Sequence, residues 1–340
     1  MRVTVSAPGK LMLLGEHAVV YGRPCLVTAV DRRMWVTAER AQDELVHLSA
    51  PSLGVVDWAA PAVEVEAAEP PASLRFLHAV VRCVAQQYGL PGGLRMETRS
   101  DFSGALGLGS SAAVTIAAAA ALSELLGLEL SRAELFPLGY EAVQAVQGLG
   151  SGFDLAASLH GGTLYFRRCG PEIVPLSADP LPLVVGYSGT KADTVSLVRR
   201  VAQRRERQPE LIEEIFDGMA RLVEQGREAL LARDWQRLGR AMRLSQSLLD
   251  ALGVSTPKLA QLVRVAEEAG AYGAKLSGAG GGDCMIALVG EARRDEVVAA
   301  IEGVGGEVIP VQTGATGVRR EGSQRISIAD LAGFSPSVIR

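Results

Sequence analysis

The residues with the clearest chemical potential form a short stretch rich in glycine and serine, LGLGSSAA at 106–113, which precedes an alanine-rich apolar run. Gly107 and Gly109 have no Cβ, so the backbone there can approach a ligand closely. A helix that begins at this point would present unpaired N–H groups and the positive end of its dipole, and both favour phosphate. The hydroxyls of Ser110 and Ser111 could donate to phosphate or bind Mg²⁺, which prefers oxygen ligands. The stretch predicts a phosphate-binding loop, with a tight turn packed before a helix as the alternative.

This stretch differs from the two common phosphate-binding patterns. A Rossmann loop has the pattern GxGxxG and an acidic residue about 20 positions later that closes a strand. Here the third glycine is missing, and Glu129 lies beyond the expected helix. A Walker A loop needs a lysine beside the serine, and the sequence has none there. The pattern therefore argues against a dinucleotide-dependent dehydrogenase and a Walker-type nucleotide site.

Two further stretches contain loops that simple packing does not require, SAPGKLMLLGEHAVVYG at 6–22 and AKLSGAGGGDCMIAL at 274–288. The second has four glycines within five positions, which lose much conformational freedom on folding. Between two predicted strands, such a run indicates close approach of the backbone to a ligand, and a flexible hairpin tip is the alternative. The glycines concerned are Gly278, Gly280, Gly281 and Gly282.

The first half of the chain supplies strands and helices that would position these loops. Alternating apolar residues predict a strand at the N-terminus that breaks at Pro8. Apolar residues at helical spacing predict a helix over 73–88, and the alanine-rich run predicts another over 111–126. Ser131 and Glu134 have the spacing of a capping box, so a third helix should begin there.

The second half of the chain predicts a separate layer. Residues 169–182 are rich in proline and polar residues and are the best candidate for a domain junction. Residues 194–252 are predicted to form two or three long helices that break near Pro209 and Asp234. Alternating strands and helices follow and predict a second mixed α/β layer. Residues 318–340 show no clear period and are expected to be a surface tail.

Length and composition place the chain among ordinary globular proteins. It has 340 residues, 48% of them hydrophobic and 21% charged, which suits about two domains. The net charge of −4 argues against a nucleic-acid partner, whose surface would require concentrated basic residues. The one basic cluster, RRERQ at 204–208, is interrupted by Glu206 and is expected to be a solvated helix face.

Cysteine usage and hydropathy predict a cytoplasmic protein with reduced thiols. The four cysteines are widely spaced and form no CxxC pair. The N-terminus lacks the apolar core of a signal peptide, and no run approaches ~18 apolar residues, so no membrane span is expected. The sequence leaves the oligomeric state open, with a homodimer as one candidate assembly. The cysteines are Cys25, Cys83, Cys169 and Cys284.

APGKLMLLGEHAVVYG, LGLGSSAA and KLSGAGGGDC, in this order, resemble the three signature motifs of the GHMP kinases (galactokinase, homoserine kinase, mevalonate kinase and phosphomevalonate kinase). The similarity covers about residues 3–315 and implies an α+β fold of two domains with the active site in the cleft between them. The implied parts are an N-terminal mixed α/β nucleotide-binding domain at 1–172, a ferredoxin-like α/β domain at 180–317 and the tail. The resemblance implies ATP as the phosphoryl donor, bound by Gly107, Leu108, Gly109, Ser110, Ser111, Ala112, Gly278, Gly280 and Gly281.

The same resemblance assigns the catalytic pair. Asp154, in GSGFDLAAS, aligns with the family's catalytic aspartate, which takes or orients the proton of the acceptor hydroxyl. Lys10 aligns with the motif lysine, which would stabilise this carboxylate and the developing negative charge. The alternatives are an N-cap role for Asp154 and a surface position for Lys10.

For Mg²⁺ the resemblance points to Ser111, with Glu141 as a candidate second ligand. The sequence departs from the family here, because the glutamate ligand of many mevalonate kinases falls at Val143. Either Glu141 substitutes for it, or the metal depends on Ser111, phosphate and water; a solvent-facing role for Glu141 is the alternative.

The acceptor is also implied by resemblance. GEHAVVYG, YSGTKADTVSLV, RRERQPELIEEIF and LLDALGVSTPKL resemble the archaeal mevalonate kinases, which implies phosphorylation of the 5-hydroxyl of mevalonate. Glu16 and His17 would line the substrate pocket, and Lys191 and Thr194 would contact the carboxylate end.

Two segments favour a different acceptor. QGLGSGFDLAAS and GGGDC, in which Asp283 stands where mevalonate kinases usually have glycine, resemble phosphomevalonate kinase. That enzyme phosphorylates mevalonate 5-phosphate, which needs extra cations; Lys191, Arg199 and Arg200 are candidates. A sensor that has lost turnover is a third possibility, and it predicts loss of Lys10 or Asp154, which are both present.

Overall fold

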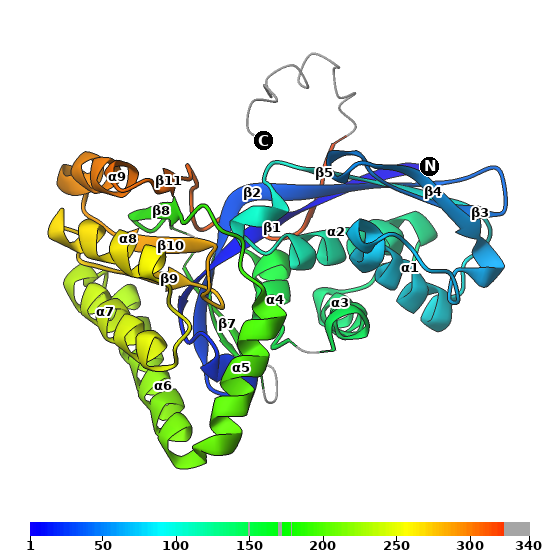
Figure 1. Ribbon diagram of the computed structural model, residues 1–340. Coiled ribbons are helices and arrows are strands. Elements are labelled where there is room, and N and C mark those ends of the chain that lie inside the picture. Colours follow the sequence, from blue (N-terminus) through cyan, green and yellow to red (C-terminus); the bar gives the residue numbers. More distant parts are fainter. Residues whose placement is uncertain (149, 169–171, 178, 323–340) are drawn as a thin grey trace.

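The computed structural model describes residues 1–322 apart from 149, 169–171 and 178. Cys169, part of the predicted junction and most of the predicted tail (323–340) therefore lie outside the described residues. The described strands form two sheets, one of eight strands and one of four. In Figure 1 the larger sheet extends across the top and right of the molecule, and the smaller lies at the left.

The eight-stranded sheet is built mainly from the first part of the chain. Its main path is β12-β1-β2-β5-β3-β4, with β6 paired to β2 and β7 paired to β6; only the β3–β5 pair is parallel among the described pairs. Its strands are β1 (Arg2–Leu14), β2 (Cys25–Arg40), β3 (Leu45–Ala50), β4 (Val55–Pro61), β5 (Leu94–Ser100), β6 (Thr163–Arg167), β7 (Glu172–Ser177) and β12 (Arg319–Arg320).

The predicted break at Pro8 is wrong. Strand β1 continues through Pro8 and Gly9, and the pairing with β2 shifts register between these two residues. An irregularity of this kind lets a strand accommodate a proline and bend without ending. The bend directs the second half of β1, which carries Lys10, toward the glycine-rich stretch.

Four helices pack beneath this sheet (Figure 1), namely α1 (Arg75–Tyr88), α2 (Ser110–Leu126), α3 (Arg132–Gln147) and α4 (Phe153–His160). Helix α2 contacts β1 and β2 as well as the other three helices, which explains why its sequence is rich in alanine. Small side chains allow elements to approach on every side of a central helix. The capping box of Ser131 and Glu134 is present at the start of α3, as predicted.

The four-stranded sheet comes from the second part of the chain. Strands β8 (Leu183–Tyr187), β9 (Gly273–Ser277), β10 (Cys284–Leu288) and β11 (Glu307–Val308) lie in the order β11-β8-β10-β9, and all pairs are antiparallel. With helices after β8 and β10, the order along the chain is β-α-β-β-α-β, the ferredoxin-like topology that the resemblance implied.

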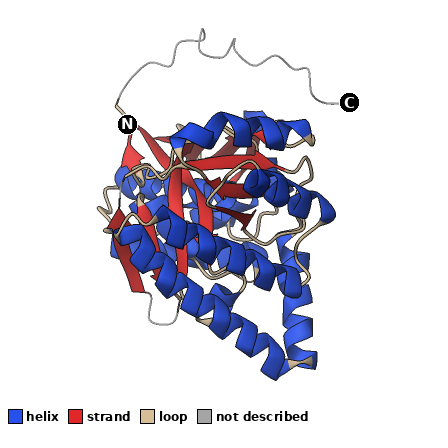
Figure 2. Ribbon diagram, turned by 90° about the vertical axis from the view of Figure 1, so that its left-hand side faces the viewer, coloured by secondary structure: helices blue, strands red, loops and turns tan. Residues whose placement is uncertain are grey.

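The helices of this second part form the layer nearest the viewer in Figure 2, with strands behind them. The predicted breaks are confirmed, because Pro209 begins one helix and the side chain of Asp234 caps the next. The helices are α5 (Thr194–Arg207), α6 (Pro209–Leu231), α7 (Trp235–Ala251), α8 (Pro257–Glu268) and α9 (Arg294–Gly303). Short 3₁₀ turns are Ala18–Tyr21, Pro51–Leu53, Ala62–Glu64, Ala72–Leu74, Gly104–Leu106 and Glu291–Arg293.

After β11 the chain returns to the large sheet. Thr313 pairs with Val30, Thr316 pairs with Gly161, and β12 adds to the edge of β1. The first residues of the predicted tail therefore belong to a sheet. No helix in the described ranges is long and apolar enough to cross a membrane.

Candidate active site

Three stretches that are far apart in sequence meet at one place. The N–H of Lys10 in β1 donates to the carbonyl of Leu108 at 2.8 Å, so β1 runs beside the glycine-rich loop, residues 104–111. Ser277 Oγ, at the end of β9, accepts from the N–H of Met12 and donates to its carbonyl, each at 3.0 Å. The first sheet, the glycine-rich loop and the loop 278–283 thus converge.

The glycine-rich loop turns its carbonyl groups into the protein. Lys10 approaches so closely that a Cβ at Gly109 would lie 3.0 Å from its Cε and Cγ. No hydrogen bond among the described residues uses the N–H groups of Ser110, Ser111 or Ala112, which open α2. These N–H groups and the helix dipole make an anion site that fits phosphate. The carbonyl contacts are Gly104 with Lys191 Nζ (2.9 Å), Leu106 with Cys284 Sγ (3.0 Å), Gly107 with Lys10 Nζ (3.0 Å) and Leu108 with the Lys10 N–H.

Asp154 faces the charge of Lys10. It is the second residue of α4, after Gly152, which has a left-handed φ of 89°. Burial raises the pKa of the Asp154 carboxyl, and the positive charge of Lys10 opposes this rise. Gly152 is the N-cap of α4, so the N-cap interpretation of Asp154 is wrong, although its Oδ1 accepts from the N–H of Leu155 at 3.0 Å. The surface position considered for Lys10 is also wrong, because this residue is buried.

Arg168 and Tyr140 brace the turn before Asp154. The Tyr140 hydroxyl donates to the carbonyl of Gly150 at 3.2 Å and accepts from Arg168 at 3.0 Å. A second nitrogen of Arg168 donates to the carbonyl of Val20 at 2.9 Å. These two residues connect the turn after β1 with the turn that precedes Asp154 and α4. Sequence reasoning missed both, since neither lies in a glycine-rich motif.

Glu16 forms an ion pair with Lys275 inside the protein. The side chains are 1% and 0% exposed, respectively. Burial lowers the pKa of Lys275, and the charge of Glu16 opposes this. The other oxygen of Glu16, Oε2, is buried and has no hydrogen-bond partner among the described residues. Sequence reasoning missed Lys275, whose signal is a single charge inside a short apolar strand.

His17 is buried beside this pair, with a left-handed φ of 59°. Its Nε2 lies 2.9 Å from the carbonyl of Ala279, which can only accept, so Nε2 carries a proton. Burial lowers the pKa of His17, which favours the neutral ring. In the neutral ring Nδ1 then has no proton and can accept a hydrogen bond.

Two predicted acceptor-binding residues, Lys191 and Thr194, lie in the loop between β8 and α5 and at the start of α5. Lys191 is exposed along most of its length, and its Nζ reaches the glycine-rich loop at Gly104. Thr194 is exposed and begins α5, which Asp193 caps. The structure therefore brings Lys191 to the glycine-rich loop and places Thr194 at the adjacent helix end.

Packing explains three of the four glycines that were expected to approach a ligand. A Cβ at Gly280 would lie 2.2 Å from the carbonyl oxygen of Val254, one at Gly281 would lie 2.6 Å from Leu197, and one at Gly282 would lie 2.4 Å from the carbonyl oxygen of Thr190. The idea that no packing argument requires this run is therefore wrong for these positions. Gly278 is different, because a Cβ there would meet nothing within 4 Å.

Curated relatives match nearly the whole chain. It is 39% identical to the mevalonate kinase of Thermococcus sibiricus over 94% of this chain and 99% of that protein. It is 37% identical to the mevalonate kinase of Pyrococcus furiosus over the same shares. The chain belongs to the GHMP kinase family. The models for the GHMP kinases N terminal domain and the GHMP kinases C terminal domain match residues 75–162 and 227–306 of this GHMP kinase.

Solved structures of GHMP kinases share the fold. The Methanococcus jannaschii mevalonate kinase has a TM-score of 0.79 and 25% identity, over 92% of this chain and 98% of that one. L. major mevalonate kinase in complex with R-mevalonate has a TM-score of 0.73 and 26% identity, over 91% and 94%. The phosphomevalonate kinase of Streptococcus pneumoniae has a TM-score of 0.73 at 19% identity, over 92% and 99%, and supports the fold alone.

This GHMP kinase directs Glu141 toward α1 and not toward the glycine-rich loop. Glu141 is exposed on α3, and its carboxylate accepts from Gln87 of α1 at 2.7 Å. Val143, at the position of the usual glutamate, is buried. Within the described part of the chain, no group of three or more His, Cys, Asp or Glu residues could hold a metal ion. Of the two candidate metal ligands, only Ser111 lies at the loop.

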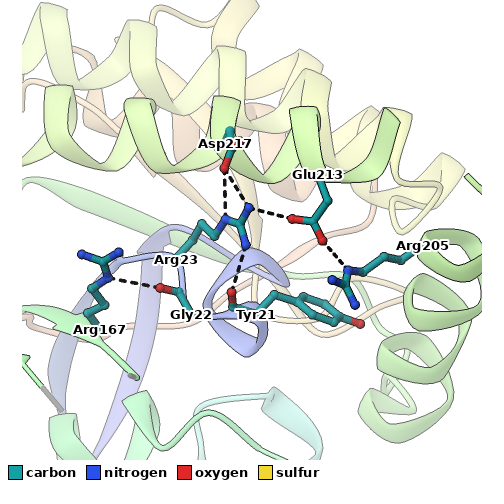
Figure 3. Close-up of polar contacts among 7 residues, drawn as sticks. All are labelled: Tyr21, Gly22, Arg23, Arg167, Arg205, Glu213 and Asp217. Carbon is teal, nitrogen blue, oxygen red and sulfur yellow. Dashed lines mark hydrogen bonds and ion pairs between the residues drawn. The ribbon is translucent and has the colours of Figure 1, made fainter. Parts of the chain in front are cut away.

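A network of charged groups joins the turn after β1 to α5 and α6 (Figure 3). Arg23 donates to Asp217 at 2.9 and 3.1 Å and to Glu213 at 2.6 Å, and Glu213 also accepts from Arg205. The guanidinium of Arg205 lies 4.8 Å from the ring centroid of Tyr21. Arg205 belongs to the basic run at 204–208, so this member of the run is engaged by the protein rather than simply solvated.

Proposed function

We propose that this GHMP kinase transfers the γ-phosphoryl group of ATP to the 5-hydroxyl of mevalonate, giving mevalonate 5-phosphate and ADP. The observation that carries the proposal is the meeting of Lys10, Asp154 and the free N–H groups of the glycine-rich loop at one place. The identity of 37–39% to proteins named mevalonate kinase, over 94% of the chain, supports the choice of acceptor.

The glycine-rich loop would bind the triphosphate. Gly107 and Gly109 have left-handed φ values of 70° and 81°, and in this conformation the N–H groups of Ser110 and Ser111 have no partner among the described residues. Gly278 has open space where a Cβ would be, so its backbone can contact the nucleotide. The nucleotide-binding residues we propose are Gly107, Leu108, Gly109, Ser110, Ser111, Ala112, Gly278, Gly280 and Gly281.

The residues present fit a Mg²⁺ ion that is bound largely through the nucleotide. Ser111 offers a hydroxyl oxygen, and Mg²⁺ usually keeps several waters and binds phosphates with few protein ligands. The ion would supply charge neutralisation of the phosphates. Because Glu141 lies against α1, it is left out of the proposed ligand set.

Asp154 would accept the proton of the acceptor hydroxyl, and Lys10 would stabilise the negative charge that develops during the transfer. The hydroxyl oxygen of the acceptor forms a bond to the γ-phosphorus as the bond from phosphorus to the ADP oxygen breaks. The hydroxyl proton passes to the Asp154 carboxylate, which Lys10 helps to keep ionised. Lys10 also offsets the negative charge that develops on the transferred group.

The remaining predicted residues would recognise the acceptor. Mevalonate carries one carboxylate, which the ammonium of Lys191 at the glycine-rich loop would bind, with Thr194 at the start of the adjacent helix. His17 Nδ1 and Glu16 Oε2 can accept hydrogen bonds from acceptor hydroxyls.

ADP release in the presence of Mg-ATP tests this proposal. Mevalonate, mevalonate 5-phosphate, homoserine and galactose are compared as acceptors, and we expect turnover with mevalonate. Turnover confined to mevalonate 5-phosphate would replace the proposal with the phosphomevalonate kinase alternative. Nucleotide binding without turnover of any acceptor would favour a sensor.

A further inference from the structure

Asp283 ends the glycine run of the loop 278–283 in an unusual conformation. Its φ is +56°, in the left-handed region where a residue with a Cβ is strained by roughly 1–2 kcal/mol. Aspartate tolerates this region better than most residues with a Cβ, so the role of Asp283 follows from the contacts of its side chain. We infer that Asp283 is a positioning residue, whose carboxylate fixes the loop 188–192 against the glycine-rich loop so that Lys191 faces the acceptor.

Asp283 holds the loop 188–192 through three hydrogen bonds. The backbone of Asp283 accepts from the N–H of Ser188 at 2.9 Å and donates to the carbonyl of Thr190 at 2.7 Å. The side chain adds the third bond, because Oδ1 accepts from the N–H of Ala192 at 2.9 Å. Lys191 lies between the two residues held most directly, so the bond to Ala192 limits where its side chain can point.

The same carboxylate lies against the glycine-rich loop. A Cβ at Gly107 would lie 2.5 Å from Asp283 Oδ2, so only glycine lets the two segments approach this closely. The charged groups that face Asp283 are Lys10 and Lys191, and both oppose the rise that burial causes in its pKa. Lys10 and Lys191 donate to the carbonyls of Gly107 and Gly104. Asp283 therefore connects the loop 188–192, which carries Lys191, to the glycine-rich loop.

Only the side-chain bond distinguishes aspartate from other residues at this position. The two backbone bonds would form with any residue, and glycine would relieve the strain of the left-handed φ. Asparagine keeps the oxygen that accepts from Ala192 and tolerates the same φ. A comparison of aspartate, asparagine and glycine at this one position thus separates the effects of the hydrogen bond, the charge and the strain.

Two substitutions test the inference, Asp283→Gly and Asp283→Asn. This part rests on the proposed function, in which Lys191 binds the acceptor. With Asp283→Gly we expect the KM for the acceptor to rise about fivefold, the effect of losing one hydrogen bond. We expect kcat and the KM for ATP to stay within about twofold and the Tm not to fall, because strain is relieved. Asp283→Asn should keep a KM near that of the wild type.

Hydrogen exchange tests the positioning without any assumption about the reaction. In Asp283→Gly the amide of Ala192 should exchange faster than in the wild type, whereas Asp283→Asn should keep it protected. Glu129→Gly is a matched control for the relief of a left-handed φ by glycine, and it should leave the exchange of the Ala192 amide unchanged. Glu129 also has a left-handed φ, of 51°, and is exposed on a different part of the chain.

The two readouts separate the inference from the proposed function. If the wild type turns over mevalonate 5-phosphate instead, the KM comparison is made with that acceptor. An unchanged KM and unchanged exchange at Ala192 in Asp283→Gly would overturn the inference. Equal losses in Asp283→Gly and Asp283→Asn would also overturn it, since the charge and not the bond would then matter.

Discussion

In the proposed reaction, turnover depends most directly on the carboxylate of Asp154, which lies in the first turn of α4 and is acted on by the charge of Lys10. The positive charge of Lys10 also acts on Asp283, but Asp283 Oδ1 already accepts a hydrogen bond from the N–H of Ala192. At the scale of single residues, the two proposals therefore give these carboxylates different roles, proton acceptor for Asp154 and positioning residue for Asp283.

Asp154→Asn should lower kcat by about 10²–10⁴-fold, the usual contribution of a positioned general base. The amide keeps the size of the side chain, so the fold and the affinity for ATP should be retained. Turnover and nucleotide binding are measured on the same preparation, with Glu141→Gln as the control because Glu141 lies against α1. Turnover at the wild-type rate would remove Asp154 from the role of base.

Lys10→Met should move the acid limb of the pH–rate profile to higher pH. Burial already raises the pKa of Asp154, and Lys10 opposes that rise, so removing the ammonium raises the pKa further. Because the base must be ionised, activity is lost as the pH falls through this pKa, and the loss should begin at a higher pH than in the wild type. Lys191→Met removes a charge that does not act on Asp154 and should leave the limb in place. An unmoved limb in Lys10→Met would contradict the assignment.

At the scale of elements, buried polar contacts hold the end of β1 and the turn after it to β9 and to the loop 278–283. Met12 bonds to Ser277 through both backbone groups, and Glu16 pairs with Lys275. His17 adds a bond to the carbonyl of Ala279. These contacts join the larger sheet to the smaller one beside the proposed pocket.

Lys275→Met should destabilise the protein by about 3–5 kcal/mol, because it leaves the carboxylate of Glu16 buried without its cation. The free energy of unfolding is measured by denaturant titration. The double variant Glu16→Gln/Lys275→Met has no buried charge and should recover part of the loss. A double variant less stable than Lys275→Met would show that the pair is not coupled in this way.

Helix starts that depend on local sequence were predictable, whereas contacts between segments distant in the sequence were not. The helix starts at Pro209, at Asp234 and at the Ser131 capping box follow from local chemistry, so the sequence predicts them. The continuation of β1 through Pro8 depends on its pairing with β2, which the sequence alone does not contain. The contact between Gly280 and Val254 is equally non-local.

The same limit applies to the site. The glycine-rich loop, Lys10 and Asp154 lie in motifs whose resemblance is visible in one sequence. Lys275, Arg168 and the side-chain role of Asp283 depend on partners more than 90 positions away or on the conformation of a turn. The domain limits predicted at 1–172 and 180–317 stay a prediction.

At the scale of the whole molecule, the returning chain after β11 closes the structure. It crosses from the smaller sheet back to the larger one, where Thr316 pairs with Gly161 and β12 pairs with β1. Arg33 is buried at this crossing. Its guanidinium donates to the carbonyls of Thr316 and Gly317 and to Ser6, whose hydroxyl in turn donates to Glu321.

Arg33→Met should therefore destabilise the molecule well beyond an average surface change, by about 2–4 kcal/mol. The substitution removes the guanidinium that donates to the buried carbonyls of Ser6 and Gly317, and a buried group that loses its partner costs about 1–3 kcal/mol. Arg33→Lys should recover only part of the loss, since an ammonium cannot match the planar fork of the guanidinium. Denaturant unfolding measures both, and Arg32→Met is the matched control, because the partly exposed Arg32 donates to the carbonyl of Pro310 through two of its nitrogens. If Arg33→Met were no less stable than Arg32→Met, the returning chain would be held by its backbone pairing alone.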